Sequence, residues 1–76
     1  MLIKINGRTK FFHGIERVTK VRPGRWDVIS FRGVYRVEGG RAAGGTSREW
    51  FVSGPCYDEP LRATSLMDAC KLIDNT

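Results

Sequence analysis

Through residues 2–53, apolar and polar positions tend to alternate, and short glycine-containing turns interrupt the pattern. Alternation of this kind is typical of β-strands, because successive side chains point to opposite faces of a sheet. Segments 2–5 and 8–12 flank Asn6 and Gly7, a pair that accepts the positive φ angles of a two-residue hairpin turn. The sequence therefore predicts a hairpin over 2–12 and an antiparallel meander over 15–53.

Within the meander, the alternation also assigns side chains to faces. The strand predicted over 25–31 has apolar residues on both faces, which suits a central strand. The pairs predicted to share a face are Trp26 with Val28, Ile29 with Phe31, Tyr35 with Val37, and Trp50 with Val52. The glycine-rich stretch 39–47 is predicted to be a flexible loop between two of these strands.

Near the C-terminus the apolar period changes from two to about 3.6. Ser65 followed by Asp68 resembles the capping box that begins helices. The apolar residues that recur on one helix face are Leu66, Ala69, Cys70 and Ile73. We therefore predict a helix over 65–74, preceded by a loop over 53–60. The predicted fold class is α+β: a single domain over 1–76, with a small antiparallel sheet of about four to six short strands and the helix packed on one face.

The composition is that of a folded domain of modest stability. Of the 76 residues, 41% are hydrophobic, and the aromatic residues are two Trp, two Tyr and four Phe. Aromatic side chains bury large areas, so they can form a core even at this length. No apolar run is long enough to cross a bilayer, and the first residues lack the apolar core of a signal peptide. We therefore expect a cytoplasmic protein without membrane contacts.

Few residues offer catalytic or metal-binding chemistry. His13 is the only histidine, and Cys56 and Cys70 do not form a C-x-x-C pair, so a tetrahedral zinc site would need a carboxylate as well. We expect two reduced thiols, with Cys70 buried on the helix, although the sequence leaves a bridge between them open. No acid and base stand at a recognisable catalytic spacing. The sequence predicts a binding protein with no enzyme activity, cofactor or metal.

The glycine-rich segment 39–45 has the composition of a phosphate-binding loop. Such loops place glycine amides at the start of a helix that follows a parallel strand. Here strands are predicted on both sides, and the Gly-Lys-Ser/Thr ending is missing. The segment is therefore predicted to be a hairpin tip that carries Arg41.

The positive charge is concentrated in the predicted strands. The formal charge of +5 consists of +7 over residues 1–50 and −2 over residues 51–76. A helix on one face of the sheet would leave the other face, the turns and the glycine loop to carry the basic residues. Arginine suits phosphates and base edges, and aromatic rings stack on bases. We predict a binding surface made of Arg22, Arg25, Trp26, Arg32, Arg36, Arg41 and Arg48.

Three interpretations of this surface are open. It could bind nucleic acid, which is the function we predict, it could dock on an acidic protein surface, or it could be a solvated face that keeps a basic protein soluble. The interactions of Glu38 and Glu49 distinguish nucleic-acid binding from protein docking. If these acids pair with the arginines across strands, a protein partner is favoured. A free edge strand also leaves a homodimer open.

Residues 24–74 contain three predicted strands followed by a helix that begins SLMDACKL at Ser65. This arrangement resembles the plant AP2 domains and the arm-binding domains of phage integrases. The likeness lies in the architecture, since the AP2 sequence signature is not matched and the N-terminal hairpin is additional. The resemblance implies a sheet in the major groove of DNA with the helix behind it. The DNA contacts would then be Arg25, Trp26, Arg32, Arg36 and Arg48.

A second likeness is local. The segments YRVEGGR (35–41), EWFV (49–52) and TSL (64–66) are similar to small accessory proteins encoded in tailed-phage genomes. This resemblance implies a phage protein in the cytoplasm of the host cell. Such a protein would act on nucleic acid, or on host machinery as an inhibitor of a host enzyme or defence complex.

Overall fold

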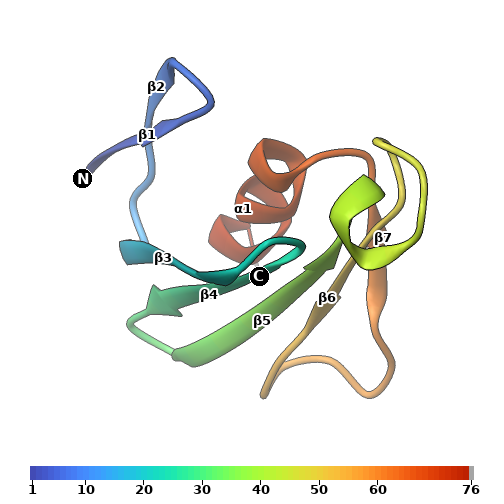
Figure 1. Ribbon diagram of the computed structural model, residues 1–76. Helices are drawn as coiled ribbons and strands as arrows, with labels where there is room; N and C mark the ends of the chain where they lie inside the picture. Colours follow the sequence, from blue (N-terminus) through green and yellow to red (C-terminus); the bar gives the residue numbers. More distant parts are fainter. Residues whose placement is uncertain (76) are drawn as a thin grey trace.

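The computed structural model describes residues 1–75 of the chain. Those residues form two antiparallel sheets, a short 3₁₀ helix and one α-helix (Figure 1). The elements are β1 (Leu2–Ile5), β2 (Arg8–Phe11), β3 (Ile15–Arg22), β4 (Arg25–Ser30), β5 (Gly33–Gly39), η1 (Arg41–Ala43), β6 (Trp50–Ser53), β7 (Leu61–Ala63) and α1 (Leu66–Asp74).

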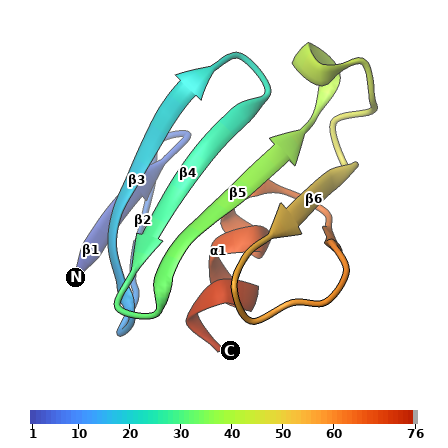
Figure 2. The ribbon, with the colours of Figure 1, turned by 90° about the horizontal axis from the view of Figure 1, so that it is seen from below.

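Strands β3 to β7 form one antiparallel sheet in which each strand pairs with the next along the chain (Figure 2). Strands β1 and β2 pair only with each other. The predicted α+β class, with an antiparallel meander and a C-terminal helix on the sheet, is confirmed. Strand β7 was not predicted, because three residues are too few for alternation to show. It pairs with β6, with Leu61 opposite Val52 and Ala63 opposite Trp50.

The N-terminal hairpin turns where the sequence predicts. Asn6 and Gly7 have φ angles of 51° and 80°, and the flanking residues Ile5 and Arg8 are paired. Positive φ at both central residues is the geometry of a type I′ turn, whose twist matches that of the strands. The hairpin buries Ile3 and Ile5 on one face and leaves its other side exposed.

Helix α1 begins with the expected cap. The hydroxyl of Ser65 accepts a hydrogen bond from the backbone N–H of Asp68 at 3.0 Å, and the carboxylate of Asp68 accepts one from the N–H of Thr64 at 3.1 Å. These two bonds satisfy donors that a helix start otherwise leaves unpaired. The buried face of the helix consists of Leu66, Ala69, Cys70 and Ile73, the four residues predicted from the spacing.

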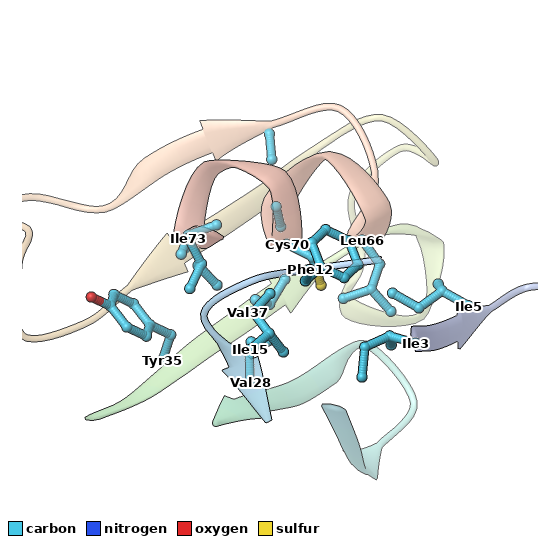
Figure 3. Packing of buried hydrophobic residues seen from close by; sticks show 13 residues of the cluster. Ile3, Ile5, Phe12, Ile15, Val28, Tyr35, Val37, Leu66, Cys70 and Ile73 are labelled. Carbon is cyan, nitrogen blue, oxygen red and sulfur yellow. The ribbon is translucent and has the colours of Figure 1, made fainter. Parts of the chain in front are cut away.

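The core lies between the five-stranded sheet on one side and α1 with the hairpin on the other (Figure 3). The largest fully buried side chain is Tyr35 on β5, and Phe12 from the end of the hairpin is next. Strands β4, β5 and β6 add Val28, Val37 and Val52 from the same sheet face. We call this the covered face, and the opposite side of the sheet the outer face.

Tyr35 packs over a glycine on the neighbouring strand segment. Gly54 follows Ser53, the residue of β6 that pairs with Arg36, and so lies opposite Tyr35. A Cβ atom at Gly54 would lie 2.6 Å from Cε2 and 2.9 Å from Cγ of Tyr35. The other side of the ring meets Tyr57, at 5.5 Å between ring centroids. Glycine is therefore the residue that lets this tyrosine close the core.

Candidate functional site

One end of the five-stranded sheet brings separate basic segments together. The backbone N–H of Gly39 donates to the carbonyl of Gly24 at 2.9 Å, and the backbone of Ala43 in η1 lies against the same turn. The turn between β3 and β4 and the loop from η1 to β6 therefore share one end of the molecule, at the top of Figure 2. Four of the predicted arginines stand on these segments: Arg22, Arg25, Arg41 and Arg48. We call this the arginine end.

Among residues 1–75, none of the four arginines at this end forms a salt bridge, although Glu49 on the same loop pairs with Arg62. Salt bridges among residues 1–75 join Arg36 to Glu38, at 3.6 Å, and Arg62 to Glu49, at 3.9 Å. Neither involves the four arginines of this end. Arg22, Arg41 and Arg48 are exposed, and Arg25 is half-buried. The guanidinium groups are thus available to an external anion.

Acidic residues gather at the opposite end of the sheet. The carboxylate of Asp74, at the end of α1, accepts hydrogen bonds from the N–H groups of Gly14 and His13, at 2.6 and 3.2 Å. The carbonyl of Gly14 in turn accepts from the N–H of Phe31 in the turn between β4 and β5, at 3.2 Å. The loop 54–60 joins this end through Pro55, which lies against Gly33. The acidic side chains at this end of the sheet are Glu16, Asp58, Glu59 and Asp74. We call it the acidic end. Arg32 and Lys71 lie at the same end, so these carboxylates are mixed with cations.

Three of the predicted site residues lie elsewhere. Arg32 is in the turn between β4 and β5, at the acidic end, where its guanidinium carbon lies 5.1 Å from the centre of the Phe31 ring. Arg36 is on the outer face and is paired with Glu38. Trp26 is on the covered face, half-buried and packed against the core. Trp26 therefore does not share a sheet face with Arg25 and Arg36, because alternation places the tryptophan on the other side.

The outer face mixes both signs of charge with exposed apolar side chains. Strand pairing places Asp27 directly opposite Arg36, and Arg36 opposite Ser53. The next row toward the arginine end consists of Arg25, Glu38, Phe51 and Arg62. Sequence reasoning did not select Asp27, Phe51 or Arg62, since their proximity depends on the pairing of four strands, one of which was not predicted. The alternation in segment 48–52 did place Phe51 opposite Trp50, which was the available signal.

Glu38 and Glu49 both pair with arginines, but among residues 1–75 neither joins a predicted arginine across strands, as the protein-partner interpretation would require. Only the Arg62–Glu49 pair joins separate strand segments, because Arg36 and Glu38 are both on β5. The two ion pairs offset the charges of Arg36 and Arg62. They do not involve the four arginines of the arginine end. The candidate site for an anion is therefore the arginine end, and the outer face beside it carries both signs of charge.

Comparisons with known protein families, with characterised proteins and with solved structures gave no match to this chain. In the part of the chain that the structure describes, α1 is too short to cross a membrane, and no other helix is long and apolar enough to do so. Across residues 1–75, no three His, Cys, Asp or Glu side chains are grouped so that they could hold a metal ion. Cys56 is an exposed free thiol, and Cys70 is a buried one.

Proposed function

We propose that this protein binds nucleic acid, with the arginine end against the phosphate backbone. The observation that carries the proposal is the gathering of Arg22, Arg25, Arg41 and Arg48 at one end of the sheet, without ion-pair partners among residues 1–75. A guanidinium group can donate two parallel hydrogen bonds to one phosphate.

Removing the two loop arginines tests this proposal. Arg41→Ala combined with Arg48→Ala is expected to weaken binding of a labelled DNA duplex roughly tenfold at about 50 mM salt. The slope of log Kd against log salt should also fall by about 2, because each lost phosphate contact releases about one counterion fewer. Fluorescence anisotropy between about 50 and 200 mM salt measures both quantities.

A matched control removes the same charge from the other end. Arg32→Ala combined with Lys71→Ala changes two exposed cations near the acidic end and should leave the salt slope unchanged. Equal losses in the two double variants would show that net charge alone governs binding. Absence of binding by the unaltered protein at low salt, to the duplex and to a single strand of the same sequence, would refute the proposed function.

A protein partner is the second candidate, and the outer face is the observation that favours it. Arginines paired with Glu38 and Glu49 beside the exposed Phe51 give a surface of mixed charge around an aromatic residue. Aromatic residues and arginine are enriched in protein interfaces. A pull-down from lysate with and without nuclease separates the candidates: a stoichiometric partner that persists after nuclease treatment supports the protein interface, whereas loss of the captured material supports nucleic acid.

A further inference from the structure

The outer face is hollowed between Arg25, at the arginine end, and Gly54, where the loop to the acidic end begins. A depression of about 300 Å³ is lined by Arg25, Asp27, Val34, Arg36, Ser53 and Gly54. Val34 is apolar and exposed, Gly54 has no side chain, and the other four side chains are polar. Convergent polar groups of this kind orient ligands in binding sites.

The polar groups around the depression have unused hydrogen-bonding capacity. Asp27 is half-buried, and its carboxylate has no hydrogen bond or ion pair within residues 1–75, although Arg36 stands directly opposite on β5. The Nε of Arg25 is buried and has no acceptor among the same residues. Arg36 contacts Glu38 through Nη1. The depression thus presents the carboxylate of Asp27 beside Arg36, whereas the buried Nε of Arg25 is closed to a ligand.

An aromatic side chain stands beside this depression. Phe51 precedes Ser53 by two residues on β6, so both point to the outer face. Phe51 is 45% exposed, an unusual position for a phenylalanine in a row that also contains Arg25, Glu38 and Arg62. Its ring is available for stacking and lies between the depression and the arginine end.

Resting on the proposed function, we infer that the depression receives an unpaired nucleobase and that the neighbouring base stacks on Phe51, so the ligand is single-stranded. A base inside a duplex presents neither its face nor its Watson–Crick edge, whereas an extended strand offers both. Strands β5 and β6 would guide the nucleotide backbone from the depression past Phe51 to Arg41 and Arg48.

The charges in the depression favour guanine among the four bases. A carboxylate accepts hydrogen bonds only, and guanine presents adjacent N–H donors on its Watson–Crick edge. Guanine also carries the O6 and N7 acceptors to which arginine commonly donates. Asp27 and the two flanking arginines complement this arrangement. Adenine instead presents a donor beside N7, thymine a single acceptor and cytosine a donor.

Three variants test the inference. The probes are a labelled single strand of about ten thymidines with two central guanosines, an all-thymidine strand of the same length, and the duplex of the first strand. Phe51→Leu is expected to lower affinity for both single strands about tenfold and to leave the duplex unchanged. Asp27→Asn should remove the preference for the guanosine strand, because an amide replaces one acceptor by a donor. Phe31→Leu is the matched control, since it removes an aromatic ring that is 69% exposed at the acidic end.

The outcomes distinguish this inference from the proposed function. If the duplex binds as tightly as the strands and Phe51→Leu changes neither affinity, the base site is wrong, while loss of binding in the Arg41 and Arg48 variant still supports a phosphate contact. If Phe31→Leu and Phe51→Leu have equal effects, the depression is not the site. If none of the three probes binds at low salt, the proposed function itself is refuted.

Discussion

Replacing Gly54 by alanine is expected to lower the free energy of unfolding by about 3 kcal/mol, the upper part of the range for overpacking a core. The added methyl group would overlap the Tyr35 ring, with 2.6 Å to Cε2 and 2.9 Å to Cγ. The ring cannot move outward, because Tyr35 is fully buried and Tyr57 packs against it. Either the ring leaves its place or β5 and the chain after β6 separate. Urea unfolding followed by tryptophan fluorescence measures the loss.

Gly45→Ala is the matched control for this substitution. At that position the nearest atoms to a Cβ lie 3.5 Å away, which is ordinary van der Waals contact. We expect its urea midpoint to stay close to that of the unaltered protein. Both substitutions remove the flexibility of a glycine, so that loss would not explain a lower midpoint of Gly54→Ala alone. Equal midpoints for all three proteins would mean that the Tyr35 ring has room to move, contrary to the packing described.

Local signals sufficed for much of the fold. Asn6 and Gly7 require few neighbours to form their turn, and Ser65 needs only the next turn of the helix to act as a cap. The stripe from Leu66 to Ile73 is equally local. Strand β7 is different, since it is held by pairing with β6 and by its contact with α1. A local pattern of three residues is too short to predict this strand.

The candidate site depended more on pairing than on composition. The uneven charge was visible in the sequence, but the gathering of four arginines at one end follows from the turn at Gly24 meeting η1. Alternation correctly separated Trp26 from its neighbours, yet it could not say which side α1 would cover. The juxtaposition of Asp27 with Ser53 required the register of three strands. Residues far apart in the chain thus became a site only through tertiary structure.

Alkaline pH is expected to destabilise the protein through the buried thiol on α1. Burial, and secondarily the charge of Asp74, raise the pKa of Cys70 from 9.0 to about 12. Below pH 9 the thiol is protonated in both the folded and unfolded chain, so its contribution to stability is constant. Between pH 9 and 12 the unfolded chain releases this proton and the folded chain does not, which favours unfolding as pH rises. At about pH 10.5 the loss from this group is about 2 kcal/mol.

Two variants isolate the contribution of Cys70. Cys70→Ala removes the thiol, and Ile73→Val removes one methyl group from the same buried face; each should cost about 1 kcal/mol at about pH 8. Tyr35 is present in both, so the rise of its pKa to about 12, caused by interaction with Cys56 and by burial, contributes equally. Urea unfolding at about pH 8 and 10.5 should then show a decline in Ile73→Val that exceeds the decline in Cys70→Ala by about 2 kcal/mol. Identical declines would mean that the thiol ionises in the folded protein as readily as in the unfolded chain, and that water reaches the space between α1 and the sheet.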